Sequence, residues 1–436
     1  MIQGTGASFT LRDKETDVPH RVFLGRRGDD LPRFQAAAQV MDRCPSFPGE
    51  LGETEASEQA GVAGSEVRWE HLGEGLRQRF EALQIFMELL LKGRKLPDSL
   101  GIPMDSVLFR RLRHVASGLS GICRGPARSA AWTWFGATDF VLQPDGELCV
   151  LDQDFSLPSG LERLADVDVS GYPGETFVQF VRRQLFPDGV HCGGEPALML
   201  EPAHAGSAGA ANGFLAECLQ LERVHRGLLR SERDGLRVLR DGRWDSVRFL
   251  VRRIDDDLLD PNFFRPDSLV GVPGLIRHWS AGSLSVFSAP GSGLFRQRAI
   301  VSRVPQMIRE FLGESSRLPT VEQLEFDRES DLAAVLHQPQ QYMFRPNDPL
   351  EAVRPCCGRV ASSVELSRIL ERIRNAPADW CARPLRLNLS AGLHVRVFAS
   401  MTDRFRILPL GLARRCDPDG GAPALIPAES PISLLF

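Results

Sequence analysis

Apolar residues recur at steps of three and four between residues 67 and 95, and this spacing predicts a helix with one apolar face. A second stretch, 104–120, repeats the pattern. Both stripes are expected to cover a sheet and to belong to the core, not to a cofactor site. The repeating positions are Leu72, Leu76, Phe80, Leu83, Met87 and Leu90, then Met104, Val107, Leu108, Leu112, Val115 and Leu119.

Two short apolar runs, 140–142 and 148–151, flank the turn sequence Pro-Asp-Gly at 144–146 and predict a β-hairpin. In a hairpin centred on that turn, the beginning of the first strand lies beside the end of the second. Polar residues placed at these two ends are therefore brought together.

Three carboxylates occupy those ends. Asp139 opens the first predicted strand, and Asp152 and Asp154 close the second. Residues two apart on a strand point to the same face, so Asp152 and Asp154 are expected to face Asp139 together. Such a cluster suits a hard cation such as magnesium, above all where phosphate oxygens complete its shell. The alternative is a surface hairpin with solvated acids.

A second pattern follows the hairpin and is typical of an open α/β layer. We expect the strands at 247–254 and 284–288 to be parallel neighbours, because the helical stretch 266–281 lies between them. The other predicted elements are a helix at 173–186, a strand at 195–201, a small-residue loop at 203–213, a helix at 214–221, a strand near 224–230 and a hairpin at 234–244.

The segment 252–275 comes directly after one of these strands, where ligands bind in open α/β sheets. Arginines interleave with consecutive acids there, which favours an ion-pair network lining a cleft, although a solvated acidic turn is the alternative. The residues concerned are Arg252, Arg253, Asp255, Asp256, Asp257 and Arg265.

The C-terminal third contains a predicted helix at 300–313 and a short strand that ends at Arg345. No glycine occurs between that strand and Gly358, so 346–358 is not expected to form a glycine loop over phosphates. Two further strands are predicted at 379–389 and 394–400.

Composition excludes several classes of protein. The 436 residues are 43% hydrophobic and 25% charged with a net charge of −4, which predicts no nucleic-acid or anionic-membrane partner. No apolar run approaches the roughly 20 residues of a membrane span, and residues 1–20 lack a signal pattern, so a cytoplasmic protein is expected. The nine scattered cysteines predict neither a zinc site nor a disulfide framework.

The hairpin resembles the metal-binding hairpin of ATP-grasp ligases, in which Asp139 matches an Asp, Asp152 stands at a Glu and Asp154 at an Asn. The segment from 252 to 275 is similar to the R-R-x-D-D-D-x-L-D-P and V-P-G-L motifs of circularly permuted ATP-grasp proteins, a bacterial family. Ser288 stands where their Asn-Ala-Pro-Gly turn has Asn. The hairpin precedes the α/β layer here, whereas it comes last in ordinary ATP-grasp ligases, which supports permutation.

The resemblance implies a mixed α/β (α+β) fold, namely a circularly permuted ATP-grasp fold with an open α/β pre-ATP-grasp-like layer. We expect an N-terminal extension and linker at 1–65 and helices with the metal hairpin at 66–190. The pre-ATP-grasp-like domain is expected at 191–300 and the ATP-binding half at 301–436.

Site residues follow from the same resemblance. ATP and Mg²⁺ are the implied cofactors, with Asp139, Asp152 and Asp154 as metal ligands. Arg345 stands where the family has a phosphate-contacting lysine, and Arg396 matches a phosphate- or substrate-facing arginine, so both are candidates for catalysis and ATP binding. Arg383 lies in the segment that matches the hinge strand beside adenine. The candidate substrate-binding residues are Arg253, Asp255, Asp256, Asp257, Arg265 and Ser288.

The implied function is ATP-dependent ligation of a small-molecule or peptide carboxylate to an amine through an acyl phosphate. The alternative is a catalytically inactive member that serves as a binding or partner subunit, with a protein as its partner. No lysine occurs after Lys95, the glycine loop is missing, and 430–436 offers no Ser/Gly-rich phosphate-contacting tail. These departures favour the alternative, whereas the retained acids favour the enzyme.

Overall fold

The computed structural model describes residues 8–12, 19–24, 71–102, 113, 135–142, 147–155, 158, 160, 161, 164, 179, 181, 182, 196–203, 208–326, 329–347, 353, 355–385, 393–401, 405–415 and 432–434. The predicted helices at 104–120 and 173–186 and the linker at 49–65 therefore fall almost entirely outside the described residues. Among described helices, none is long and apolar enough to span a bilayer.

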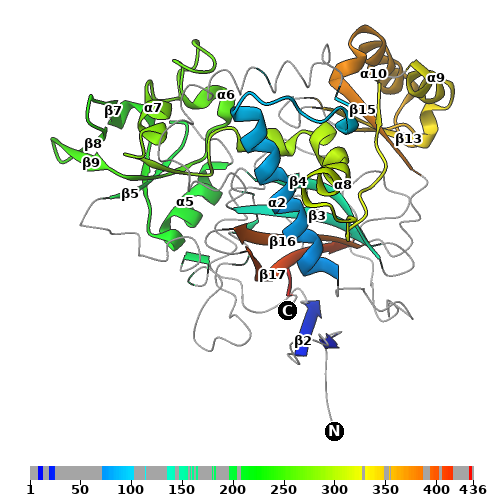
Figure 1. The fold of residues 1–436 in the computed structure, drawn as a ribbon, viewed down its shortest axis with the longest axis horizontal. Coiled ribbons are helices and arrows are strands. Elements are labelled where there is room, and N and C mark those ends of the chain that lie inside the picture. Colours follow the sequence, from blue (N-terminus) through cyan, green and yellow to red (C-terminus); the bar gives the residue numbers. More distant parts are fainter. Residues whose placement is uncertain are drawn as a thin grey trace.

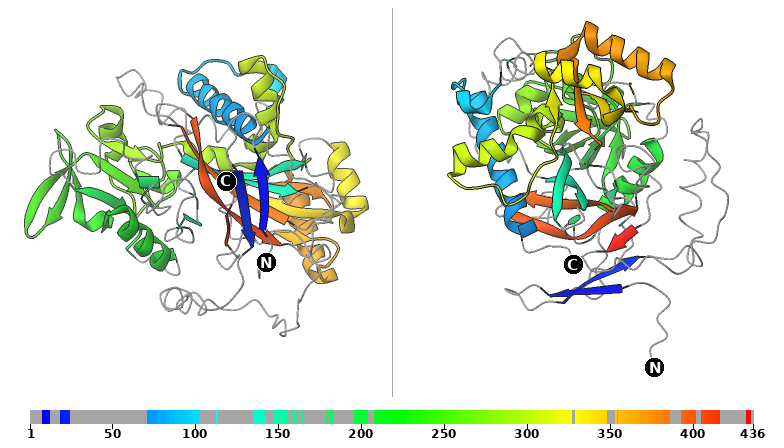
Figure 2. Two further views of the ribbon diagram at one scale, coloured as in Figure 1. Left: turned by 90° about the horizontal axis from the view of Figure 1, so that it is seen from below. Right: turned by 90° about the vertical axis from the view of Figure 1, so that its right-hand side faces the viewer.

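A seven-stranded antiparallel sheet forms the centre of the molecule (Figure 1). Figure 2 shows β1 and β2 at one edge of it, within the N-terminal region where no pattern predicted strands. In spatial order its strands are β1 (Ser8–Arg12), β2 (Pro19–Leu24), β18 (Ile432–Leu434), β17 (Phe405–Arg415), β16 (Leu393–Met401), β3 (Phe135–Leu142) and β4 (Leu148–Asp154).

The predicted long helix is present as α2 (Leu72–Leu91), and its apolar stripe is buried as expected. It packs against α8 (Arg298–Leu312), the helix predicted at 300–313, and both lie beside β3 and β4 (Figure 1). The short 3₁₀ helix Asp98–Leu100 follows α2 and also packs on α8.

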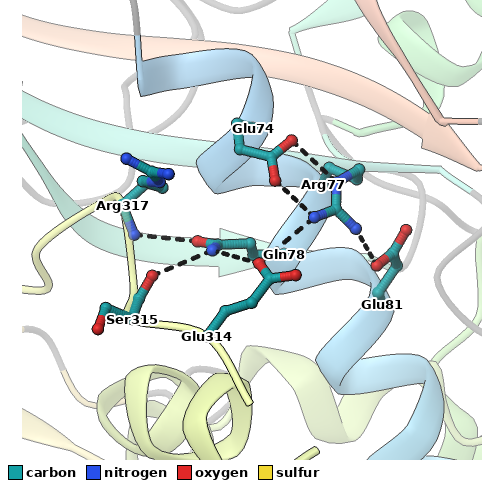
Figure 3. A network of polar contacts seen from close by, with 7 residues as sticks. All are labelled: Glu74, Arg77, Gln78, Glu81, Glu314, Ser315 and Arg317. Carbon is teal, nitrogen blue, oxygen red and sulfur yellow. Dashed lines mark hydrogen bonds and ion pairs between the residues drawn. The ribbon is translucent and has the colours of Figure 1, made fainter. Parts of the chain in front are cut away.

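Polar bonds fix α2 to the chain that follows α8 (Figure 3). The Gln78 side chain donates to the Glu314 carboxylate at 2.7 Å and to the Ser315 carbonyl at 3.0 Å, and accepts from the Arg317 amide at 2.9 Å. Because the next residues pair with the edge of β4 through Val150, this contact holds α2 beside the hairpin.

The predicted α/β layer is confirmed as a four-stranded parallel sheet in the order β11 (Ser285–Phe287), β10 (Phe249–Arg252), β5 (Ala197–Leu200), β6 (Glu222–Val224). As predicted, β10 and β11 are parallel neighbours. Its helices are α5 (Ala208–Leu219), α6 (Asp256–Leu259) and α7 (Leu275–Ser280), with 3₁₀ turns Arg226–Leu228 and Ser292–Arg296 (η7).

Two predictions in this layer need correction. Helix α5 begins at residue 208, inside the stretch predicted to be a loop, because its small residues tolerate helical backbone as well as turns. The strand expected near 224–230 is broken by a 3₁₀ turn, and its second part, β7 (Leu229–Ser231), joins a separate sheet. That sheet pairs β7 with the predicted hairpin, β8 (Leu236–Arg240) and β9 (Arg243–Val247).

A third antiparallel sheet holds the C-terminal strands predicted near Arg345 and at 379–389. Helices α9 (Glu329–His337) and α10 (Ser363–Asn375) pack on it through a separate apolar cluster (Figure 1, upper right). Its order is β12 (Leu324–Glu325), β15 (Trp380–Pro384), β13 (Tyr342–Pro346) and β14 (Cys356–Cys357), with 3₁₀ turns Pro339–Gln341 and Pro377–Asp379.

Candidate functional site

The hairpin acids lie on paired strands. In the antiparallel register of β3 and β4, Asp139 stands opposite Asp152, and Ala137 stands opposite Asp154. The predicted proximity of Asp139 and Asp152 is thus confirmed. One detail differs, because β3 begins at Phe135 and Asp139 lies in its middle. The apolar residues before it are buried and extend the strand.

Asp139 forms a matched pair with Arg396, which stands opposite it on β16. The guanidinium Nε donates to Oδ1 and Nη2 donates to Oδ2, both at 2.7 Å, and both side chains are buried. Burial alone would lower the pKa of Arg396, but the charge and hydrogen bonds of Asp139 outweigh it and leave that pKa above its ordinary value. This is a fully satisfied bidentate ion pair.

Asp152 is paired differently. Its Oδ2 lies 3.5 Å from Nη2 of both Arg298 and Arg345. Arg345 comes from β13 in the third sheet, and Arg298 opens α8, so this contact joins that sheet to the central one. Arg298 also donates from Nη1 to the Pro346 carbonyl at 2.6 Å, which fixes it against the end of β13.

Positive charge exceeds negative charge around Asp152. Arg383 on β15 is also buried, and burial, followed by neighbouring Arg345, lowers its pKa to about 9. Burial and then Arg298 lower the pKa of Arg345 to about 10. With these pKa values Arg345 and Arg383 remain cations at neutral pH. Within the described part of the chain, the buried Nε atoms of Arg298 and Arg345 have no hydrogen-bond partner.

This arrangement has the chemistry of an anion site. Buried charges are normally paired, and one carboxylate oxygen at 3.5 Å does not satisfy the guanidinium groups of both Arg298 and Arg345. Guanidinium groups favour phosphate and carboxylate, which accept two parallel hydrogen bonds. The unused donors are therefore suited to an anion with several oxygen acceptors, such as a phosphate. We call Asp152, Arg298, Arg345 and Arg383 the arginine centre.

At the same end of the hairpin, beside Asp154, Arg296 brings together the two motifs that the sequence singled out. It follows the turn at Ser288, lies on η7 against β4, and bonds to the carboxylate of Asp255. Burial opposes its charge, but Asp154 and then Asp255 raise its pKa above the ordinary value. The Nε atom of Arg296 is buried without a partner.

Asp256 and Ser288 build the turn between these motifs. The Asp256 carboxylate accepts from the amides of Gly291 at 2.8 Å and Gly293 at 2.7 Å and pairs with Arg252 at 2.8 Å. A Cβ on Gly293 would lie 2.4 Å from Asp256 Oδ2, so that position requires glycine. The Ser288 carbonyl accepts from Arg252 Nε at 2.8 Å. Their bonds within the protein position η7 and Arg296.

The remaining candidate substrate residues are dispersed. Arg253 donates to Asn212 Oδ1 at 2.8 Å. Arg265 forms an exposed pair with Asp267 at 2.7 Å instead of joining the acids of 255–257 as expected, although its backbone amide donates to the exposed residue Asp257. The predicted ion-pair network therefore forms around Asp255 and Asp256 and does not extend to Arg265.

The expected metal site at Asp139, Asp152 and Asp154 stays a prediction. Within the part of the chain that the structure describes, no three His, Cys, Asp or Glu residues lie close enough to hold an ion. The physical reason is the competition from arginine, because Arg396 takes both oxygens of Asp139 and two other guanidinium groups take Asp152. These acids alone do not fit a preformed metal site. Residues 346–358, which are not expected to form a glycine loop over phosphates, lie partly outside the described residues, at 348–352 and 354, so that expectation stays a prediction.

Two residues of the site, Arg296 and Arg298, were missed by sequence reasoning. Nothing in the local pattern distinguishes them from surface arginines. A third buried arginine, Arg79 on α2, supports the hairpin from its other face by donating to Gln153 Oε1 at 2.7 Å. It lies in the apolar stripe of a strongly patterned helix, and that position was the available signal.

Comparison with known proteins agrees with this fold. The profile of the circularly permuted ATP-grasp type 2 family matches residues 175–416, more than half of the chain. The chain belongs to this family. It is 29% identical over 347 residues to an uncharacterized protein of Synechocystis, covering 75% of this chain and 69% of the relative.

Two other relatives extend the comparison. A Frankia alni protein that carries the provisional name glutamate–cysteine ligase 2-3 is 30% identical over 330 residues, which is 72% of this chain and 37% of that protein. An uncharacterized protein of Mycobacterium bovis is 26% identical over 341 residues, covering 74% of this chain and 60% of the relative. The chain thus spans between about a third and two thirds of these relatives' lengths.

Proposed function

We propose that this chain is an ATP-dependent, carboxylate–amine ligase-like protein, and that the arginine centre holds the ATP phosphates. The observation that carries the proposal is the unmatched charge: two buried guanidinium groups, those of Arg298 and Arg345, share one oxygen of Asp152, and their Nε donors have no partner among the described residues. Arg383 adds a third buried arginine beside them. Membership of the ATP-grasp family supports a nucleotide as the anion.

The arginines proposed to hold the phosphates come from two parts of the fold. Arg345 and Arg383 come from the third sheet and Arg298 from the beginning of α8, so a triphosphate bound there would be held from two sides. Their fixed positions would orient the γ-phosphate and offset the charge that moves onto the leaving ADP. Arg396 supports this face through its pair with Asp139 and is assigned a positioning role.

Arg296 is the proposed receptor for the acid substrate. Its guanidinium is largely buried, has an unused Nε donor, and lies near Asp154 at the end of the metal-hairpin strand. A substrate carboxylate held there would attack the γ-phosphorus, forming an acyl phosphate and releasing ADP. An amine would then attack the acyl carbon and release phosphate, so that one ATP is consumed for each amide formed.

Magnesium accompanies ATP in ATP-grasp ligases, where it neutralises phosphate charge. Asp152 and Asp154 are the residues proposed to face it. The described acids form no three-ligand group, so phosphate oxygens would have to supply part of the shell, and no step is assigned to the ion.

A specific observation favours the second candidate, a nucleotide-binding partner subunit without catalysis. The acids that ligase chemistry would use for metal are already occupied by arginine, as Asp139 is by Arg396. On this reading ATP binds to the arginine centre without being turned over.

One assay separates the two candidates. The chain is incubated with ATP, magnesium, hydroxylamine and a panel of carboxylates beginning with glutamate, because Frankia relatives are named for glutamate and cysteine. Ligase function predicts hydroxamate and ADP in equal amounts, both lost in Arg296→Gln and retained in Arg309→Gln, an exposed arginine on α8. ATP binding without hydroxamate across the panel would support the partner subunit, and absence of ATP binding would contradict both.

A further inference from the structure

A cavity lies in the parallel-sheet layer, outside the arginine centre. Its volume is about 640 Å³, within the roughly 300–1,000 Å³ typical of small-molecule sites. None of its lining residues belongs to the arginine centre or its neighbours. In Figure 1 the strands beside it, β7 to β9, lie on the opposite side of the molecule from β13 and β15.

The position of the cavity in the fold is that of a ligand site. Ala203 follows β5 and His225 follows β6, and these strands are parallel neighbours. The cavity therefore opens at the carboxyl ends of two parallel strands, where open α/β sheets bind their ligands. The segment after β10 was expected to bind a ligand at such an end, and the cavity lies at the ends of two other strands of this sheet.

One wall carries an unmatched cation. Arg226 is half-buried, and its Nη1 donates to the Ser268 carbonyl at 3.1 Å. Among the described residues no carboxylate lies within ion-pairing distance of Arg226, whereas the neighbouring Arg230 pairs with Glu232 and stacks 4.2 Å from the Trp244 ring. Arg226 is thus the guanidinium on this wall that retains capacity for an external anion.

Another part of the cavity lining is apolar. Leu269 is 84% exposed at the cavity, beside Val272. The backbone of this segment is packed closely on the chain before it, because Val272 N donates to Leu259 O at 2.9 Å and a Cβ on Gly271 would lie 2.0 Å from the Leu258 carbonyl. A ligand that covers Leu269 would remove apolar surface from water.

We propose that this cavity binds an organic carboxylate with a short branched apolar chain, as a second small-molecule site of the protein. The carboxylate would accept a bidentate pair from Arg226, and the chain would cover Leu269 and Val272. A single unmatched guanidinium suits a monoanion better than a phosphate dianion, and the apolar wall opposes a second charge.

The experiment uses N-acetyl-L-leucine as the probe and the uncharged analogue N-acetyl-L-leucinamide as its control. Each compound is titrated into the full chain and its binding is measured by calorimetry. The carboxylate is expected to bind at least 10-fold more tightly than the amide. Arg226→Gln should lower its affinity at least 10-fold, Leu269→Ser should lower it several-fold, and Arg226→Lys should lie between wild type and Arg226→Gln. Circular dichroism checks that each variant is folded.

Two controls make the result specific to this cavity. Arg345→Gln in the arginine centre and Arg309→Gln on the surface should leave the affinity for the probe unchanged. Equal binding of carboxylate and amide, no binding of either, or full affinity in Arg226→Gln would overturn the proposal. Loss of probe binding in Arg345→Gln would also overturn it, because the probe would then occupy the nucleotide centre.

Discussion

Two aspartates face each other across the β3–β4 hairpin and have opposite surroundings. Asp139 gives both oxygens to one arginine, Arg396, at 2.7 Å. Asp152 shares one oxygen between Arg298 and Arg345 at 3.5 Å. The Asp139 carboxylate is paired through both of its oxygens, whereas two guanidinium groups share one oxygen of Asp152. The difference suggests that the Asp139 pair is part of the framework, whereas the surroundings of Asp152 are prepared for an anion.

Substitutions at the two places should therefore change the free energy of unfolding in opposite directions. Removing one partner from a satisfied buried pair leaves an isolated charge, which is costly. Removing a surplus buried cation removes its repulsion from neighbouring cations and its desolvation cost. Such a change stabilises the fold while it weakens function, as is common for substitutions in binding sites. Substitution in the two places separates these cases, and the predictions below run from the largest effect to the smallest.

Asp139→Asn should destabilise the fold by about 3–5 kcal/mol, because Arg396 would remain buried without its counter-charge. Urea unfolding monitored by circular dichroism measures the change. The double variant with Arg396→Gln should regain part of the loss. A single variant as stable as wild type would show that the pair contributes nothing to the framework.

Inorganic triphosphate should stabilise the wild-type protein, because its charge alone satisfies the arginine centre. At 100 times its Kd the gain is about 2.7 kcal/mol. The shift in Tm is measured by calorimetry, with sulfate at equal ionic strength as the control. The Arg345→Gln variant should show little shift, and an equal shift in both proteins would place the anion elsewhere.

Arg383→Gln should stabilise the ligand-free fold by about 0.5–2 kcal/mol while weakening phosphate binding. Burial and Arg345 lower the pKa of Arg383, which shows that its charge is disfavoured in the folded state. Chemical denaturation of the two proteins side by side is the measurement. A clear loss of stability would mean that Arg383 is already well paired in the folded protein.

Arg265→Gln should change neither stability nor phosphate binding measurably, because Arg265 is paired with Asp267 at the surface. The same calorimetric and unfolding measurements test this. A selective loss of activity with an acid substrate would restore the substrate role that the sequence motif suggested.

Local patterns were sufficient to predict much of the fold. The stripe of α2, the hairpin of β3 and β4, and the crossover between β10 and β11 each depend on residues close in sequence, and all are present. The family motifs added the class of fold, which the comparison with known proteins supports.

The ion-pair partners in the site could not be predicted from local sequence patterns. Arg298 lies 146 residues from Asp152 in the sequence, and spacing says nothing about such a pair. Asp139, Asp152 and Asp154 were correctly placed on one hairpin, but the partners of Asp139 and Asp152 come from β13, β16 and α8. Whether carboxylates meet a metal or an arginine depends on those distant elements, so the hairpin alone could not show that arginines take Asp139 and Asp152.

The most direct test of the central claim is calorimetric titration of ATP with magnesium into wild type, Arg345→Gln and Arg309→Gln. If the arginine centre is the phosphate site, wild type and Arg309→Gln bind with the same Kd, and Arg345→Gln binds at least 10-fold more weakly, the loss of about 1.4 kcal/mol expected for one charge-assisted contact. Equal affinity in all three proteins would contradict the assignment of the unmatched arginines to nucleotide.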